Sequence, residues 1–241
     1  MKRLLLFALM MFACACVGQR DDPEEPDDGP GTVDPSDVKG SCLVLDFTGT
    51  WCVNCPRMDA AIEEAMEKRP GLIVPVSVHC LSLDPMAVSP LCDNLIKRFG
   101  VSAYPSVVVD LSPGSLFSTT SSDLLLSKCD ALLKERGASS EIECEYSVQG
   151  DVISVTVKAK TAVPGDYSLQ FIVVEDGIVS PQTGGTQDHV HNNVLREWHE
   201  SEPFPNAAAG QELTYTDTAA ANGDFRVIAL VCRGGVVDNV K

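Results

Sequence analysis

The stretch TGTWCVNCPRM, residues 48–58, decides how this chain folds. It carries two cysteines, Cys52 and Cys55, three positions apart and directly behind Trp51. The run before it, CLVLDF at 42–47, is almost wholly apolar, as expected of a strand that is covered on both faces. Apolar residues then recur at helical spacing, at Met58, Ile62, Ala65 and Met66. The motif therefore marks the passage from a buried strand into a helix.

The alternation of strand and helix continues beyond this motif. Two further strands are predicted at 72–79 and 106–111, and two further helices at 92–100 and 121–137. Pro75 has no N–H group, so it has to lie at a sheet edge or a bulge. Strands that alternate with helices predict an α/β layer structure for residues 40–139.

The sequence changes in character after Ser139. Residues 140–241 consist of β-rich runs separated by Gly, Pro, Asn and Asp, and little of this part has helical periodicity. Turn residues at intervals of about 8–12 positions are typical of an antiparallel sandwich. We therefore predict an all-β, immunoglobulin-like sandwich domain at 140–241, following a separate domain at 40–139.

The N-terminus has the features of a secretion signal. Two basic residues precede the apolar run LLLFALMMFACAC, which ends in small residues. This ending resembles the lipobox of bacterial lipoproteins, which implies a signal peptide at 1–16 and a lipid on Cys16, with Cys14 as the alternative. The following stretch, 17–39, is rich in Asp, Glu and Pro and predicts a disordered acidic tether. An acidic run behind a lipobox also resembles the surface-export signal of lipoproteins from Bacteroidota.

The overall charge and hydropathy narrow the range of partners. The formal net charge is −16 and basic residues do not cluster, which argues against nucleic acid as a partner. No apolar run reaches the roughly 18 residues of a membrane-spanning helix. Contact with a membrane is therefore expected through the lipid anchor.

Three interpretations of Cys52 and Cys55 are open: half of a zinc site, a permanent disulfide, and a redox-active dithiol. Zinc would need a second Cys/His pair at close spacing, and the chain has no second CxxC motif. At the N-terminus of a helix, unpaired N–H groups and the helix dipole stabilise a thiolate at Cys52. Cys55, one turn further on, can attack a mixed disulfide formed there. We favour the dithiol and predict neither a metal nor a cofactor.

Around this motif the chain resembles the thioredoxin-like superfamily. The resemblance rests on the strand LVLDF, on the sequence WCVNC at 51–55, and on the pair Tyr104-Pro105 before a strand. It implies that Pro105 is cis and lies against the dithiol. It further implies that Trp51, Tyr104 and Pro105 shape a groove for the substrate.

The same resemblance assigns a part to Asp46, which lies where thioredoxins keep a buried acid. An isolated buried carboxyl has a raised pKa and can take the proton of Cys55 as that thiol attacks. The alternative is an Asp46 at a strand edge that faces solvent. The chain departs from the family at Val53 and Asn54, between the cysteines, and at Pro56, so a redox potential does not carry over.

Other cysteines and histidines suggest further links. The cysteine pairings that we weigh are Cys42 with Cys129, Cys144 with Cys232, and Cys80 with Cys92. In the segment DHVHNNVLREWH, His189 and His191 would point the same way on a strand, and with His199 they hint at a metal, although a structural part is favoured. Asn192 and Arg196 are predicted to bridge the two halves.

As a whole, the chain resembles the Omp-twenty-eight-like lipoproteins of Bacteroidota outer membranes. The resemblance combines the lipobox, the acidic tether, TGTWCVNCP and HVHNNVLRE. It implies a lipid-anchored outer-membrane protein at the cell surface, with the periplasmic face as the alternative, and implies no particular reaction. Two functions are therefore open. One is a thiol–disulfide oxidoreductase that acts on protein clients or a redox partner, and the other is a surface binding or adhesion module without turnover.

Overall fold

The computed structural model describes residues 40–241. The predicted signal peptide at 1–16, the lipidation site at Cys16 and the acidic tether at 17–39 lie outside the described residues. Within 40–241, no helix combines the length and the apolar composition needed to cross a membrane.

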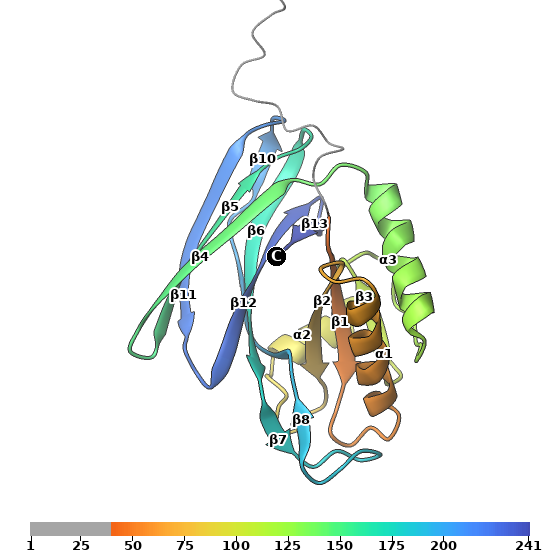
Figure 1. Cartoon of the computed structure of the whole chain (residues 1–241). Coiled ribbons are helices and arrows are strands. Elements are labelled where there is room, and N and C mark those ends of the chain that lie inside the picture. Colours follow the sequence, from red (N-terminus) through yellow and green to blue (C-terminus); the bar gives the residue numbers. More distant parts are fainter. Residues whose placement is uncertain (1–39) are drawn as a thin grey trace, which may run out of the picture.

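The first half of the described chain alternates strands and helices, in the order and kind that the sequence predicts (Figure 1). Its elements are β1 (Cys42–Thr48), α1 (Cys55–Lys68), β2 (Ile73–His79), α2 (Leu91–Phe99), β3 (Ser106–Val109) and α3 (Ser122–Arg136). Strand β1 is central, with β2 parallel to it on one side and β3 antiparallel on the other. Both later helices end at a glycine, as predicted.

Strand β1 has both faces buried, and its alternating side chains assign the helices to opposite faces of the sheet. Leu43, Leu45 and Phe47 pack in a core cluster with α2. Cys42 and Val44 point the other way, into a cluster formed with α1 and α3. Asp46 follows the alternation of this second set, so its side chain points towards α1.

The second half is built of strands, as predicted. They are β4 (Glu141–Gln149), β5 (Val152–Lys160), β6 (Gly165–Asp176), β7 (Ile178–Ser180), β8 (His189–His191), β9 (Val194–Glu200), β10 (Phe204–Ala207), β11 (Glu212–Ala220), β12 (Asp224–Arg233) and β13 (Val236–Val240). Strands β11, β5 and β4 form one sheet, which packs on β6 and β12 around a core of aliphatic side chains and the rings of Tyr167 and Phe171.

The larger sheet does not stop between the halves. Its order is β13-β12-β6-β9-β2-β1-β3, so strands of both halves share one hydrogen-bonded layer. The joint is short: β9 runs parallel to β2 at Ser77 and Val194, and the Ser77 N–H donates to the Asn193 carbonyl at 2.7 Å. One core cluster accordingly contains Leu43 and Phe47 from β1 together with Leu230 from β12.

This continuity refines the predicted architecture. The fold is mixed α/β, and the second half does contain two packed sheets, but one of them is shared with the first half. The boundary between 139 and 140 stays a prediction: α3 ends at Arg136 and β4 begins at Glu141, while the sheet and its core continue across.

Pro75 is placed as its missing N–H requires. It pairs with Val44 of β1, but β9 joins the opposite side of β2 only at Ser77. The side of Pro75 that cannot donate a hydrogen bond therefore has no strand to meet, and the residue borders a cavity.

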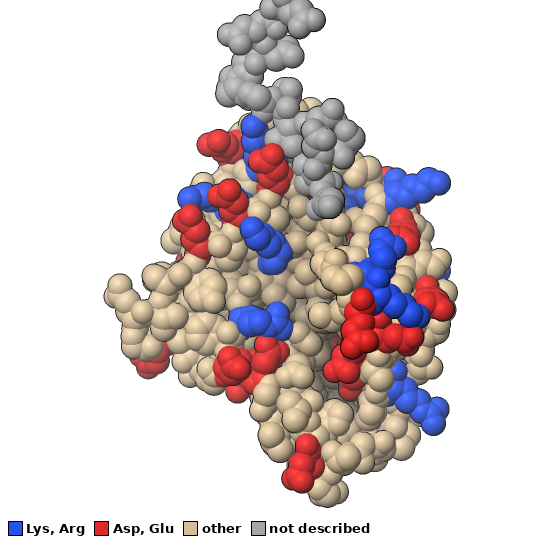
Figure 2. Space-filling model, viewed as in Figure 1, with Lys and Arg blue, Asp and Glu red and all other residues tan. Residues whose placement is uncertain are grey.

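The face formed by α1 and α3 carries charges of both signs side by side (Figure 2). Lys68 lies 3.0 Å from Glu64 and 2.7 Å from Asp123, and Arg69 lies 3.2 Å from Asp130. These side chains are substantially exposed, so each pair contributes about 0–1 kcal/mol. The pairs help to orient α1 against α3, but the two helices are held in place mainly by the packing of their apolar faces.

Because the halves share one core, we expect them to unfold in a single transition. The chain has two tryptophans, Trp51 in the first half and Trp198 in the second. Urea unfolding followed by fluorescence in Trp51→Phe and Trp198→Phe variants therefore reports on each half separately. Coincident midpoints and equal m-values are expected after correction for the stability of each variant. Two separate transitions would contradict a shared core.

Candidate active site: a disulfide at the start of helix α1

The two cysteines of the motif form a disulfide at the first turn of α1. The sulfur–sulfur distance is 2.10 Å and the Cα atoms lie 5.5 Å apart. Cys52 precedes the helix and is 5% exposed, whereas Cys55 is its first residue and is fully buried. Pro56 lies in the first turn, where its missing N–H is not needed. The more accessible sulfur thus lies beside the unpaired N–H groups of the helix start.

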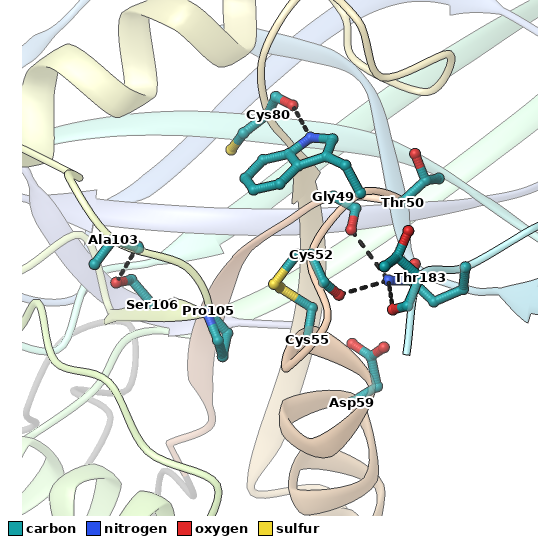
Figure 3. Close-up of a disulfide and its surroundings, with 12 residues drawn as sticks. Gly49, Thr50, Cys52, Cys55, Asp59, Cys80, Ala103, Pro105, Ser106 and Thr183 are labelled. Carbon is teal, nitrogen blue, oxygen red and sulfur yellow. Dashed lines mark hydrogen bonds between the residues drawn. A yellow bond between two sulfur atoms is a disulfide. The ribbon is translucent and has the colours of Figure 1, made fainter. Parts of the chain in front are cut away.

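Pro105 lies opposite the disulfide (Figure 3). The Tyr104–Pro105 peptide is cis, as the resemblance implies. Two hydroxyl groups hold this turn, since Ser118 Oγ donates to the Pro105 carbonyl and Ser106 Oγ donates to the Ala103 carbonyl, both at 2.7 Å. The sequence reasoning did not find a second cis peptide, Ser89–Pro90, before α2.

Trp51 and Tyr104 meet beside the dithiol. Their rings are 5.0 Å apart in an edge-to-face arrangement, and Trp51 Nε1 donates to the Cys80 carbonyl at 3.1 Å. Gly49 is required under the indole, because a Cβ there would lie 2.5 Å from Nε1. Burial and the nearby Cys80 thiol raise the pKa of Tyr104 to about 12, so its phenol is neutral at physiological pH.

Several apolar side chains of the motif and of the loop that follows Cys80 are exposed. Trp51 is 37% exposed and Val53 is 59% exposed. Leu81 and Leu83, in the loop after Cys80, are exposed as well, Leu83 by 91%. Exposed apolar groups that surround a reactive bond are suited to contact with a polypeptide. Leu81 and Leu83 were missed by the sequence reasoning, because nothing in a loop sequence distinguishes an exposed leucine from a buried one.

Asp46 is buried beneath the start of α1, and the solvent-facing alternative is wrong. Its side chain is 1% exposed, and no N–H or hydroxyl group of the described residues donates to either carboxyl oxygen. Burial raises the pKa of Asp46 well above its ordinary value, and the negative charge of Asp59 raises it further. A carboxyl in this position therefore holds its proton strongly.

Asp59 was not identified from the sequence. It lies on α1 one turn after Cys55, a spacing that puts both residues on the same side of the helix. Burial raises the pKa of Asp59, while the neighbouring Asp46 carboxyl and the charge of His189 act to lower it. The spacing from Cys55 is a usable signal, but three glutamates in the same helix conceal it.

The second half of the chain holds the motif from one side. In the segment between β7 and β8, Gln182 Nε2 donates to the carbonyls of Gly49 at 3.2 Å and Cys52 at 2.9 Å. The Thr183 N–H donates to the Thr50 carbonyl at 2.8 Å. Gly184 packs so closely that a Cβ would lie 2.2 Å from the Val53 carbonyl oxygen. We call residues 182–184 the clamp.

Asp84 holds the same turn from the other side. Its carboxylate accepts hydrogen bonds from the Thr50 N–H at 2.6 Å, from the Met86 N–H at 2.9 Å, and lies 3.2 Å from His79 Nδ1. Burial alone would raise the pKa of Asp84, but the hydrogen bonds and charge of His79 and the backbone donors hold it below its usual value. The turn is therefore held by partners from both halves.

The predicted bridges between the halves are confirmed. Arg196 Nη1 donates to the Met86 carbonyl at 3.1 Å, and its Nε pairs with Glu175 at 2.6 Å. The Asn192 carbonyl accepts from Ser77 Oγ at 3.1 Å. These contacts connect β9 to the first half on both sides of the joint at Ser77.

The histidines do not gather as a single group. His189 and His191 lie 4.7 Å apart between ring centres, and His79 lies 5.3 Å from His191. His199 lies apart from them, stacked on Phe171 and close to Glu197 and Asp217. Residues 40–241 contain no set of three or more His, Cys, Asp or Glu side chains with the geometry of a metal site.

The three clustered histidines line a cavity of about 290 Å³ on the side of α1. Pro56, Asp59 and Ser77 also border it, so the cavity begins directly behind the disulfide. Burial and the neighbouring imidazoles lower the pKa of His191 to about 4, so this ring is neutral at pH 7. Its Nε2 lies 3.3 Å from the Ser180 carbonyl and can donate to it.

The other cysteines within residues 40–241 are free thiols, which corrects the three pairings weighed from the sequence. Cys144 and Cys232 pack in different core clusters, on opposite sides of the β12 strand. Cys80 and Cys92 share a cluster without a bond. Cys42 and Cys129 do lie against each other, with Cys42 Sγ 3.8 Å from the Cys129 carbonyl oxygen.

The chain matches no protein-family model and no curated protein. Among solved structures it is similar to HBP35 of Porphyromonas gingivalis, with 19% identity and a TM-score of 0.70 over 84% of this chain and 74% of that one. A protein of Agrobacterium tumefaciens is similar at 13% identity, with a TM-score of 0.59 over 85% of this chain and 94% of its own. At these identities the similarity shows the fold: both structures cover the two halves together.

We predict that Gln182→Ala destabilises the protein, because the buried carbonyls of Gly49 and Cys52 lose their donor. The expected loss in the free energy of unfolding is about 1–3 kcal/mol, measured by urea denaturation. Gln187→Ala, an exposed glutamine in the same connection between β7 and β8, is the matched control and should change little. Equal stability of the two variants would show that the clamp does not hold the turn.

Asp46→Asn should stabilise the protein at neutral pH. The pKa of Asp46 is raised in the folded state, so this carboxyl contributes stability below its unfolded pKa of 3.8 and that contribution is lost as the pH rises. We expect a gain of about 1–3 kcal/mol at pH 7–8 that disappears below about pH 4. The exposed Asp188→Asn variant should stay within about 0.5 kcal/mol of the parent. A gain that did not depend on pH would contradict the raised pKa.

Proposed function

We propose that this chain is a thiol–disulfide oxidoreductase whose reactive groups are Cys52 and Cys55. The observation that carries the proposal is the placement of this pair at the start of α1, opposite Pro105 and above a buried carboxyl. Each part supplies a separate need of disulfide exchange: a stabilised thiolate, a surface for the client backbone and a proton acceptor.

The reaction proceeds in two exchanges. In the reduced protein, the Cys52 thiolate attacks a client disulfide, forms a mixed disulfide and releases one client sulfur as a thiolate. Cys55 then transfers its proton to the ionised form of Asp46, which the raised pKa makes a strong base, and attacks Cys52 Sγ. The Cys52–Cys55 bond forms, the bond to the client breaks, and the client has gained two electrons.

The surface beside the dithiol would bind the client. Trp51 and Tyr104 pack against each other there, Pro105 lies opposite the disulfide (Figure 3), and the exposed Val53 adds apolar surface. This composition suits an unfolded or extended protein segment with apolar side chains. We assign the protein partner, whether client or redox partner, to this surface, and assign no nucleic acid.

The location is part of the same proposal. We infer that the chain is an exported lipoprotein related to the Omp-twenty-eight-like family, anchored to the outer membrane through a lipid on Cys16 and exposed at the cell surface. The leader sequence supports this location. The second half, which we assign to an immunoglobulin-like sandwich domain at 140–241, would hold the dithiol turn through the clamp rather than form a separate binding site.

One observation favours a second function, a binding or adhesion module with a permanent disulfide. Cys52 is only 5% exposed, and its turn is held on both sides by hydrogen bonds from Gln182 and to Asp84. A reduction potential below about −300 mV, typical of structural disulfides, would support this module over the enzyme.

The test of the oxidoreductase is the reduction of a model protein disulfide in the presence of dithiothreitol. Cys52→Ser should abolish turnover and form no mixed disulfide, and Cys55→Ser should accumulate the mixed disulfide at Cys52. Cys144→Ser, a half-buried cysteine on β4, is the control and should retain activity. Full activity of the Cys52→Ser variant would refute the proposed function.

A further inference from the structure

We propose that Asp59 forms a proton-sharing pair with Asp46, and that the pair exchanges its extra proton with solvent through the histidine-lined cavity beside α1. The inference rests on the proposed disulfide exchange, because it concerns the proton that Cys55 loses when it attacks. It adds a residue from α1 and an exit for the proton to the single acid expected from the sequence.

The two carboxyls come together from different elements. Asp46 points from β1 towards α1, and Asp59 lies on α1 one turn below the disulfide (Figure 3). Each carboxyl is among the groups that shift the pKa of the other, so the two are close neighbours. Two ionised carboxylates have no donor to offer, and Asp46 has none from other described residues. The contact is therefore favourable only when one of the two carries a proton that both share.

Only one member of the pair borders solvent. Asp46 is 1% exposed, so its proton has no direct way out. The Asp59 side chain is 33% exposed and lines the cavity, where His189 Nε2 lies 3.9 Å from its Oδ2. The route therefore leads from Cys55 to the carboxyl pair, and from Asp59 to water or to His189.

Charged and titratable groups from every neighbouring element face Asp59. Asp46 lies on β1, Glu63 on the same helix, His79 on β2 and His189 on β8. The acids favour protonation of Asp59, and the imidazoles, when charged, oppose it. These opposing influences make the pKa of Asp59 depend on the groups that line the cavity.

The proton balance of the resolving step follows from this arrangement. Before the step the pair holds one proton and has one basic site left. It takes the proton of Cys55, the Cys55 thiolate attacks Cys52 Sγ, and the client leaves as a thiolate. The doubly protonated pair then releases one proton through Asp59. Asp59 acts through Asp46 and is thus a positioning residue in this account.

The test isolates the resolving step in the full chain. Reduced protein is mixed with dithiobis(nitrobenzoate), which labels Cys52 in a first phase. Attack by Cys55 then releases a second nitrobenzoate thiolate in a unimolecular phase, and its rate is recorded against pH by stopped flow. The Cys55→Ser variant identifies this phase by losing it.

The wild-type rate should show two inflections from the pair, since coupled acids titrate in two macroscopic steps. Asp59→Asn should lose one of them, and Asp59→Glu should restore two. Glu67→Gln removes an exposed acid from the same helix and should keep both. His189→Gln should move the lower inflection to higher pH, because the imidazolium no longer favours the ionised carboxyl.

Failure of the carboxyl pair and failure of the proposed oxidoreductase would give different results. Two unchanged inflections in Asp59→Asn, or a single inflection in the wild type, would overturn the pair while leaving the oxidoreductase intact. If the pH profile of His189→Gln were the same as that of the wild type, His189 would take no part in the proton exchange. If the wild type released no second thiolate at any pH, the oxidoreductase and the pair would both be refuted. Should Asp59→Asn fail to fold, the Asp59→Glu and His189→Gln profiles still decide.

Discussion

The short parallel pairing between β2 and β9 is the constraint on which the rest of this molecule depends. At Ser77 a sheet that would otherwise end continues into β9, β6, β12 and β13. Since β8 directly precedes β9, the same joint places the clamp against the dithiol turn and the histidines against α1. The cavity and the support of the motif therefore both lie beside this joint between the halves.

The environment of the dithiol is electrically asymmetric. On the helix side, unpaired N–H groups favour negative charge at Cys52. Beneath it, Asp46 is buried with no N–H or hydroxyl donor among the described residues and so favours the neutral form. One site thus favours a thiolate and the adjoining site favours the uptake of a proton, which are the two properties that exchange between two sulfurs requires. Burying Asp46 lowers the stability of the fold, so packing alone does not explain why a carboxyl is found here.

Local pattern predicted much of the first half and little of how the halves meet. The apolar run at 42–47 and the spacing after Cys55 were sufficient to place a buried strand and its helix, and alternation along that strand agrees with a buried Asp46. The joint at Ser77 links segments that are far apart in the chain. A parallel pairing this short produces no periodic pattern in the sequence of either segment. Gln182 could not be recognised for the same reason, since its partners are backbone carbonyls that every residue offers. Asp59 was concealed among the acids of an amphipathic helix.

The central claim is that Cys52 is anionic at neutral pH, and the most direct test is its alkylation. The reduced chain is treated with iodoacetamide over a range of pH, and modification of Cys52 is quantified by mass spectrometry of its peptide. The account predicts a rate that rises with a midpoint between about 3.5 and 7.5, as for thiols at helix N-termini. A midpoint at or above about 8.5, the value of an unperturbed thiol, would contradict it.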